Sequence, residues 1–380
     1  MSSSIRRLVA AASAIISMVG LTACSHGSNS SSAPKTNAAG GSCSSVVKSA
    51  RAAVDKASAK DTPWAGPTTG PAAVSGKSIV YVAADMTNPG VAGAASGVTA
   101  AAKAIGWRVR VIDGKGTPAG TQSAFSQALA LRPDGIMIGG FDPNSTSAQV
   151  AQANQANIPL VGWQALATPG PSTSPKLFSN VTTKVADVAK ITADWIIAES
   201  NGTAGVVVFT DKSIPFAAGK SAMIEKELKT CSSIKLLSTQ NIPLADVSNR
   251  MPAAVSSLVS KYGQKWNYST AINDVYFENA AAPLRAAGVK AGDIVNIGAG
   301  DGDTSALQRI RSGNYQAASV PSPLVSEGWQ MIDEMNRALN NAPASGYVPA
   351  VHVSTKANLG PANSWNPSGY EAAYKKIWKR

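Results

Sequence analysis

The sequence predicts an α/β protein with two doubly wound, Rossmann-like lobes, each built on a parallel sheet that is covered by helices on both faces. Three observations predict this fold. Short apolar runs without polar alternation are typical of strands buried on both faces. These runs alternate with segments of helical length from Lys77 onward, and the alternation restarts near residue 200. The chain has 380 residues, 44% of them hydrophobic, which is enough for two domains with separate cores.

The first predicted strand leads into the first candidate ligand site. Ile79–Ala83 is an apolar run, Asn88-Pro89-Gly90 forms a tight turn, and the segment Val91–Ile105 has helical length. Open α/β sheets bind ligands at the carboxyl ends of their strands. We therefore expect the loop Thr87–Gly90 to contact a ligand.

The remaining elements continue the alternation. Early in the chain we expect further strands at Arg108–Ile112, Gly135–Ile138 and Leu160–Gly162, and helices near 119–131 and 145–156. Later we expect helices near 184–199, 217–229, 250–262 and 323–339, and strands at Gly205–Phe209, Ile234–Leu237, Asp274–Phe277, Ile294–Ile297, Tyr315–Val320 and Ala350–Val353. Two lobes that face each other across a cleft are the simplest arrangement of this order.

The amino terminus is predicted to be an export signal that ends in a lipidated cysteine. Arg6 and Arg7 precede an apolar stretch, Leu8–Leu21, that is short for a membrane span. The segment Leu21-Thr22-Ala23-Cys24 resembles a bacterial lipobox, and the alternative is an ordinary leader with a chance cysteine. We expect a signal peptide over 1–23, a lipidated cysteine and flexible tether over 24–42, and an N-terminal extension over 43–76.

Cysteine and histidine residues are few. Cys43 and Cys231 remain after lipidation of Cys24, and in an oxidising compartment they either form a disulfide or stay as separate thiols. The sequence leaves both possibilities open. His26 and His352 have no zinc-type spacing with the cysteines, so we expect no metal and no cofactor.

The net charge of +12 comes from 34 basic and 22 acidic residues that are scattered along the chain. Because no dense basic run with interleaved aromatics is present, a nucleic-acid partner is disfavoured. A solvated basic surface, with some attraction to anionic lipid, fits this pattern better.

Several motifs in order make the chain similar to the ribose-binding family of type I periplasmic substrate-binding proteins, which serve ABC transporters. The motifs are Thr87-Asn88-Pro89, the segment Ala153–Val161, the segment Val275–Asn279, and Ile297-Gly298-Ala299-Gly300-Asp301-Gly302. The resemblance covers about residues 77–355. It implies a monomer, exported and anchored outside the cytoplasmic membrane or in the periplasm, that delivers a small ligand to an ABC permease and its ATPase.

The resemblance also implies that the chain crosses between the lobes three times, forming a three-strand hinge. The crossings would lie near Asn180–Lys184, Ser322 and Pro349–Val353. The first lobe would then comprise residues 77–181 and 323–349, and the second lobe residues 182–322 and 350–380. A ligand would stabilise closure of the two lobes around it.

Five residues are candidates for ligand binding. Asn88, Lys220, Asn279 and Asp301 are implied by positions that match the family, and Asp142 is a candidate because it ends the third predicted strand. Asn88 would hydrogen-bond the ligand or act as a turn residue. Asp142 would bind ligand or cap the following helix. Lys220 would bind a ligand oxygen or lie on the surface. Asn279 and Asp301 would bind from the second lobe, where Asp301 could accept from paired hydroxyls or sit in a glycine-flanked turn.

Three further candidates mark departures from the family pattern. Gly90 and Val91 stand where sugar binders place aromatics, and Gln164-Ala165 replaces an Asp-Arg pair. Trp163 would supply a stacking surface or pack in the core at a strand end. Ser322 replaces an amide-bearing position. We therefore expect the ligand to be a small polar molecule. A sugar or polyol is the first expectation, and a nucleoside or an aromatic compound is the alternative.

Other functions are less well supported. A ligand sensor of the same fold that signals to a membrane receptor or kinase is the main alternative. A nucleotide-binding enzyme is a distant third, because the loop Gly298–Gly302 lacks the last glycine of a dinucleotide motif and Asp303 would repel pyrophosphate. We find no set of residues suited to catalysis and expect a protein that is not an enzyme.

Overall fold

The computed structural model describes residues 41–380. The predicted signal peptide, Cys24, His26 and nearly all of the predicted tether lie outside the described residues. Within residues 41–380, no helix is both long enough and apolar enough to cross a membrane.

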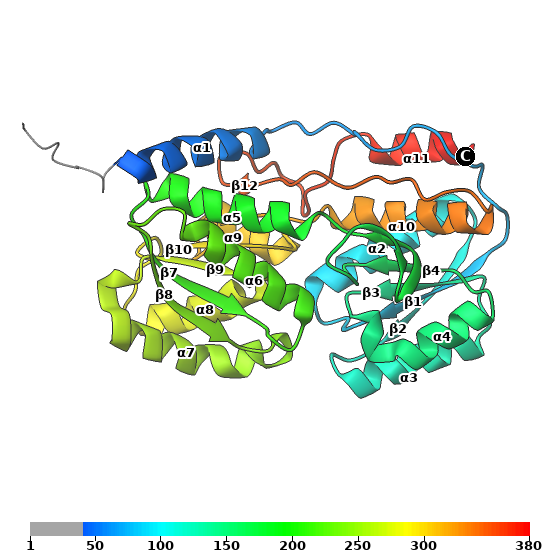
Figure 1. Ribbon diagram of the computed structural model, residues 1–380, viewed down its shortest axis with the longest axis horizontal. Helices are drawn as coiled ribbons and strands as arrows, with labels where there is room; N and C mark the ends of the chain where they lie inside the picture. Colours follow the sequence, from blue (N-terminus) through cyan, green and yellow to red (C-terminus); the bar gives the residue numbers. More distant parts are fainter. Residues whose placement is uncertain (1–40) are drawn as a thin grey trace, which may run out of the picture. The chain divides into compact units, whose positions relative to one another are not determined.

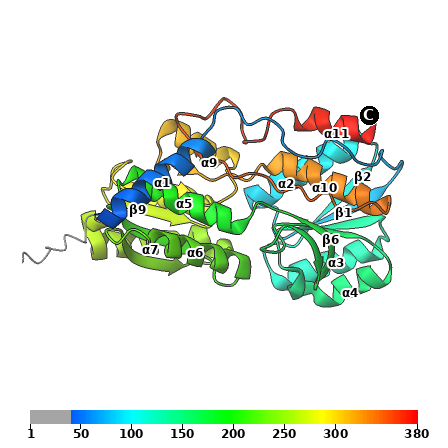
Figure 2. The same ribbon diagram turned by 45° about the horizontal axis from the view of Figure 1, so that its top comes forward.

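The first lobe is built on a six-stranded sheet with the order β2-β1-β3-β4-β6-β5. Its strands are β1 (Ser78–Ala83), β2 (Arg108–Asp113), β3 (Gly135–Gly139), β4 (Leu160–Trp163), β5 (Gly170–Thr173) and β6 (Lys176–Val181), and all pairs are parallel except β5 with β6. The helices of this lobe are α2 (Pro89–Ala104), α3 (Pro118–Ala130), α4 (Ser147–Gln155) and α10 (Leu324–Leu339). Helices α2 and α10 lie side by side, as Figures 1 and 2 both show.

Strand β1 shows why the sequence of this sheet lacks polar alternation. Ile79 and Tyr81 pack into the core that α2 and α10 cover, whereas Val80 and Val82 pack into the core beneath α3 and α4. Each strand position therefore faces apolar side chains on one side or the other.

The second lobe is built on a sheet with the order β12-β11-β10-β9-β7-β8. Its strands are β7 (Gly205–Thr210), β8 (Lys235–Asn241), β9 (Tyr268–Ala271), β10 (Val295–Gly298), β11 (Ala318–Ser319) and β12 (Ser354–Thr355), and only β12 runs antiparallel to its neighbour. The helices are α5 (Val185–Glu199), α6 (Pro215–Leu228), α7 (Val247–Tyr262), α8 (Val275–Ala286) and α9 (Thr304–Ser312). The predicted fold of two doubly wound lobes is confirmed.

The chain passes from one sheet to the other at three places after β1. It leaves the first sheet between β6 and α5, returns between β11 and α10, and leaves again between α10 and β12. The segments 182–184 and 320–323 are the two shortest of these connections, and they bring the carboxyl ends of β6 and β11 close to the lobe boundary.

Two predicted strands are wrong. Ala350–Val353 forms no strand, and β12 begins directly after it at Ser354. The other is Asp274–Phe277. Residues 274–277 belong to α8 and its N-terminal cap, and the strand is β9, six residues earlier. Tyr276 and Phe277 form part of a buried helical face that continues through Ala280, Ala281 and Leu284. Strand β9 is polar in sequence, yet Ser269 is fully buried. Its hydroxyl tolerates burial because it accepts a hydrogen bond from the indole N–H of Trp266 at 2.8 Å.

The β5–β6 hairpin is absent from the prediction. Strand β5 consists of Gly, Pro, Ser and Thr, and a turn at 174–175 joins it to β6. Such residues are typical of loops, so their pairing as an antiparallel edge of the sheet could not be read from hydrophobic pattern.

The N-terminal extension is anchored to the second lobe. Helix α1 (Gly41–Ala57) packs along α5 (Figures 1 and 2). A disulfide joins Cys43 of α1 to Cys231, which follows α6. Of the two possibilities that the sequence left open for these cysteines, the structure contains the disulfide.

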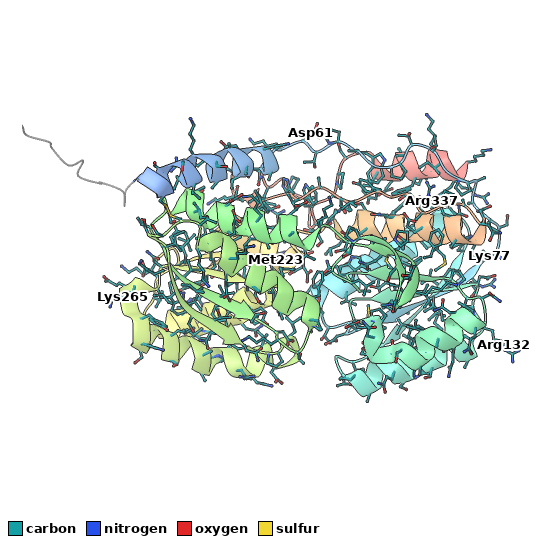
Figure 3. All side chains as sticks on the ribbon, viewed as in Figure 1. Asp61, Lys77, Arg132, Met223, Lys265 and Arg337 are labelled. Atoms are coloured by element: carbon teal, nitrogen blue, oxygen red, sulfur yellow. A yellow bond between two sulfur atoms is a disulfide. The ribbon has the colours of Figure 1, made fainter. Side chains whose placement is uncertain are left out.

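After α1 the chain continues onto the first lobe as residues 62–76, which we call the N-terminal strap. Trp64 packs against Tyr347 and Tyr374, with ring centroids 4.9 and 5.0 Å apart. Arg337 on α10 donates to the carbonyl oxygen of Thr69 at 2.8 Å, and Figure 3 shows Arg337 on α10 and Asp61 just before the strap.

The carboxyl-terminal segment was expected in the second lobe, and its last helix differs from that expectation. Strand β12 pairs with β11, but α11 (Tyr370–Trp378) packs against α10 of the first lobe. The reason is that Tyr374, Ile377 and Trp378 are buried in the core that α2 and α10 share, and Trp378 stacks on Trp329.

Candidate functional site

The N-terminus of α2 lies at the carboxyl end of β1. Asn88 caps this helix, because its Oδ1 accepts from the backbone N–H of Gly90 at 2.9 Å and of Val91 at 3.3 Å. This geometry fits the second of the two interpretations for Asn88, a local backbone role. Its ligand-binding role stays a prediction.

Asp301 of the second lobe reaches this same helix terminus of the first lobe. It follows β10, has a left-handed backbone (φ 66°) and is 6% exposed. A Cβ atom added to Gly90 would lie 2.3 Å from Asp301 Oδ2, so the carboxylate occupies the space that a side chain at position 90 would need. The absence of an aromatic at Gly90 thus allows the two lobes to touch here.

Asn273 is a site residue that sequence reasoning missed. It lies just after β9, is 7% exposed, and its Nδ2 donates to Asp301 Oδ2. The predicted Asn279 lies instead on α8, where its Nδ2 donates to the carbonyl oxygen of Val275 at 2.9 Å. The shifted position of strand β9 explains the difference, because Asn273 rather than Asn279 stands at the carboxyl end of a strand. The dipeptide Asn273-Asp274, directly after a strand, is the sequence feature that could have indicated this site residue.

Lys220 lies on α6 and is buried rather than exposed on the surface. Its Nζ donates to the carbonyl oxygens of Ala299 at 2.7 Å and Ile272 at 3.3 Å, and it lies 5.1 Å from the ring centroid of Phe216. Burial lowers the pKa of Lys220 to about 8, and the nearby carboxylates of Asp301 and Asp274 oppose this shift.

Asp274 holds the loop that contains Asp301 in place through hydrogen bonds. Its carboxylate accepts from the backbone N–H of Gly302 at 2.8 Å, from Ser319 Oγ at 2.9 Å and from Gln316 Nε2 at 2.5 Å. Burial raises the pKa of Asp274 to about 7, and the hydrogen bonds from Gly302 and Ser319 oppose the shift. Because its acceptors are already used, Asp274 positions the loop rather than a ligand.

Trp163 and Gln164, at the end of β4, connect the first lobe to the segment around α10. The indole N–H of Trp163 donates to Glu327 Oε2 at 2.7 Å, and Trp163 is 2% exposed. Gln164 Nε2 donates to Ser322 Oγ at 3.0 Å. Burial raises the pKa of Glu327 to about 8, and the negative charge of Asp301 adds to this effect. Trp163 is thus a core residue at a strand end, and a stacking role for it stays a prediction.

Asp142 is not part of this group. It caps the short 3-10 helix Pro143–Thr146, where its Oδ1 accepts from the backbone N–H of Asn144 at 2.9 Å. This is the capping role that the sequence left open beside ligand binding.

A small pocket lies between the connecting segments of the two lobes. Three of the predicted site residues, Gln164, Lys220 and Ser322, line it. Its other lining residues are Thr182, Thr183, Val185, Val188, Phe216, Gly300 and Val320. The pocket is lined by one side-chain amide, hydroxyls, one amine and apolar side chains. Within the described part of the chain, no group of three or more His, Cys, Asp or Glu side chains is placed to hold a metal ion.

Comparison with solved structures finds the same fold. The chain is similar to a sugar ABC transporter protein from Yersinia enterocolitica subsp. enterocolitica 8081, with 17% identity, a TM-score of 0.68 and coverage of 82% of this chain and 98% of that one. A solute-binding protein from Agrobacterium vitis with bound allitol gives 20% identity, a TM-score of 0.63 and coverage of 74% and 96%. A galactofuranose-binding protein gives 16% identity, a TM-score of 0.64 and coverage of 80% and 99%.

The family assignment comes from the sequence of the two lobes. None of the curated proteins matches the chain. The profile of the periplasmic binding protein domain matches residues 79–343, which includes every strand from β1 to β11 apart from the first residue of β1. This family consists of solute-binding proteins rather than enzymes. The chain therefore belongs to the periplasmic binding protein domain family.

Proposed function

We propose that the protein captures a sugar or polyol between its two lobes and delivers it to an ABC permease. The observation that carries this proposal is the contact between Asp301 of the second lobe and Gly90 of the first. It brings the carboxyl ends of strands from both lobes together, which is where open α/β sheets bind ligands. Closure of the lobes around a ligand would then report occupancy to the permease.

The chemistry at this boundary suits hydroxyl groups. Asp301 can accept from hydroxyls, whereas the amides of Asn273 and Gln164 can both donate and accept. Ser322 adds a hydroxyl at the pocket. The structural neighbours described as binding galactofuranose and allitol are consistent with a ligand of this class.

We further propose that the protein is exported and held at the outer side of the cytoplasmic membrane, or in the periplasm, by a lipid on Cys24. The support is the sequence Leu21-Thr22-Ala23-Cys24 after an apolar leader. If so, Cys24→Ala moves the protein from the membrane fraction to the soluble fraction. Retention of the variant in the membrane fraction would remove this part of the proposal.

Ligand sensing is the alternative within the same fold, since a closed lobe pair can equally be read by a membrane receptor or kinase. Permease and ATPase genes beside the gene for this chain would favour transport. Pull-down of a receptor or kinase by the ligand-bound form, without a permease, would favour sensing.

A thermal-shift screen tests ligand capture. The purified protein is unfolded and refolded to remove carried-over ligand, and is then melted with sugars, polyols, nucleosides and small aromatic acids. A ligand at ~100 times its Kd stabilises the folded state by about 2.7 kcal/mol, which raises the melting temperature measurably. A hit only among nucleosides or aromatic acids would contradict the sugar assignment, and no hit in any class would contradict capture of a small ligand by the protein alone.

A further inference from the structure

After β12 the chain crosses the lobe boundary once more, in addition to the three crossings between the sheets. Residues 360–368, which we call the C-terminal strap, follow β12 of the second lobe and lead to α11. Helix α11 packs against α10 of the first lobe. Figure 1 shows this segment running from β12 to α11. The C-terminal strap therefore joins the two lobes outside their sheets.

One end of the C-terminal strap is hydrogen-bonded to α9 of the second lobe. Arg311 donates from Nη2 to the carbonyl oxygen of Gly360 at 2.8 Å. Thr304, the first residue of α9, donates from Oγ1 to the carbonyl oxygen of Asn363 at 3.0 Å. Because Thr304 follows Asp301 by three residues, this end is attached directly behind the loop that carries the candidate ligand carboxylate.

The other end is hydrogen-bonded to α10 of the first lobe. Asn366 Oδ1 accepts from the backbone N–H of Ser326 at 2.9 Å. Ser326 lies in the first turn of α10, where backbone N–H groups have no acceptor within the helix. The N-cap residue Pro323 has no side-chain oxygen to offer. Asn366 thus supplies the capping oxygen of α10 from the C-terminal strap.

The stretch between these two attachments is short. Asn366 comes three residues after Asn363, and three residues of extended chain span at most ~11 Å. Trp365 lies between them and stacks on the buried His352, with ring centroids 4.5 Å apart and an interplanar angle of 2°. His352 belongs to the connection from α10 to β12. The C-terminal strap therefore has little slack between α9 and α10.

The start of α10 is in turn packed directly on α2. A Cβ atom added to Gly97 of α2 would lie 2.4 Å from the carbonyl oxygen of Val325, so the two helix backbones are in contact. Gly90, which Asp301 meets from the second lobe, lies two turns earlier on the same helix. The Asp301 loop, α9, the C-terminal strap, α10 and α2 thus form a closed ring of contacts across the lobe boundary.

We propose that the C-terminal strap holds the two lobes closed in the ligand-free protein. Opening moves Asp301 away from Gly90, and with it α9 away from α2 and α10. A three-residue stretch that is hydrogen-bonded to both α9 and α10 cannot follow this movement without losing hydrogen bonds. This inference rests on closure of the lobes, which is part of the proposed function, but it concerns the protein before a ligand arrives.

A closed form that is populated without ligand affects capture. The apparent Kd of a ligand falls as the binding-competent form becomes more populated, because the ligand then need not supply the free energy of closure. The C-terminal strap should therefore raise the affinity for whichever ligand the cleft takes.

Distances between the lobes measure the effect without a ligand. Spin labels on Ser123→Cys of α3 and Ser248→Cys of α7 place one label on each lobe, at exposed positions. Figure 1 shows α3 and α7 on the side of the molecule away from α1 and α11, so opening should lengthen the distance between the labels. Double electron–electron resonance on protein freed of carried-over ligand gives the distribution of this distance.

Two variants weaken the C-terminal strap in different ways. Asn366→Ala removes the acceptor for α10. Insertion of four glycine and serine residues between Asn363 and Ser364 keeps both attachments but adds slack. We expect each variant to raise the population at long distances at least about threefold over wild type.

Each variant has a matched control. Asn358→Ala removes an asparagine that donates to the carbonyl oxygens of Ser58 at 3.0 Å and Val353 at 2.7 Å, neither of which lies on the first lobe. The same four-residue insertion between Ala291 and Gly292 lengthens an exposed loop within the second lobe. Both controls should keep the wild-type distances.

The outcomes separate this inference from the proposed function. Unchanged distances in both strap variants, equal opening in either control, or a wild type already as open as the variants overturns the inference. If ligands raise the melting temperature while the strap variants stay closed, capture stands and the role of the C-terminal strap fails. If the strap variants open but no ligand of any class binds, the role of the C-terminal strap stands and capture fails.

Discussion

The carboxylate of Asp301 in the second lobe fills the space above Gly90 in the first lobe, so that no side chain fits at position 90 in this arrangement of the lobes. The contact joins the loop after β10 to the first turn of α2. Closure of the two lobes therefore depends on Gly90 and on the carboxylate of Asp301, which are far apart in the sequence.

Gly90→Ala should weaken ligand binding with little effect on folding. The added Cβ would lie 2.3 Å from Asp301 Oδ2, so either the lobes separate or Asp301 moves. Alanine is well tolerated in a helix, so the melting temperature of the ligand-free protein should change little. We expect a loss of affinity of at least about tenfold, measured by calorimetry.

Gly219→Ala is the matched control for this substitution. Gly219 lies on α6 beside Lys220, and a Cβ added there has no other atom within 4 Å. Its affinity should equal that of the wild type. Equal affinities of the Gly90 and Gly219 variants would show that the lobes do not close through this contact.

Removal of the Asp301 carboxylate should weaken binding through loss of a charged hydrogen bond. Asp301→Ala is expected to cost more than ~1.5 kcal/mol of binding free energy. Asp301→Asn keeps the shape and tolerates the left-handed backbone at φ 66°, so it separates loss of charge from loss of structure. Wild-type affinity in both variants would remove Asp301 from the site.

The pH dependence of stability should report the buried Glu327. Its pKa is raised from 4.5 to about 8 by burial, so the folded state prefers the protonated form. Its contribution to stability is complete below pH 4.5 and is lost as the pH rises through 8. Relative to wild type, Glu327→Gln should become more stable across this window, by a few kcal/mol at about 1.4 kcal/mol per pH unit.

Chemical denaturation at several pH values measures this difference, with Glu334→Gln as the comparison. The pKa of Glu334 is raised to about 7, so its window should end one unit lower. A difference between wild type and Glu327→Gln that stays constant from pH 5 to 8 would contradict a buried, raised-pKa carboxyl at this position.

Loss of the Cys43–Cys231 disulfide should loosen α1 from the second lobe. The bond closes a loop with a sequence separation of 188, and removing such a crosslink costs about 2–4 kcal/mol. In the double variant Cys43→Ser/Cys231→Ser, amide hydrogens of α1 should exchange faster than those of α5. Unchanged exchange in α1 would mean that its packing along α5 holds it without the crosslink.

The sequence predicts the strands whose residues are apolar on both faces, and it fails where buried residues are polar. Strands β1 and β7 are evident because helices cover both sides of each sheet. Strand β9 is hidden by Ser269 and Thr270, which are fully buried. Because the expected strand lies six residues later than β9, the sequence assigns the amide at the end of the strand to Asn279 instead of Asn273.

The candidate site depends on contacts that local sequence does not encode. Lys220, Gln164 and Ser322 were candidates, and they line one pocket. Glu327 was not a candidate, because a glutamate in a helix is normally solvated. It is buried because α10 is covered by α2 on one side, while the N-terminal strap and α11 contact the same helix. No local pattern indicates such coverage by both ends of the chain.

The most direct test of ligand capture between the lobes is calorimetric titration of refolded wild-type protein and Asp301→Asn with each sugar or polyol that raises the melting temperature. We expect one ligand molecule to bind per chain, and we expect Asp301→Asn to bind it with at least about tenfold lower affinity. Wild-type affinity in Asp301→Asn, or absence of binding by every sugar and polyol, would contradict it.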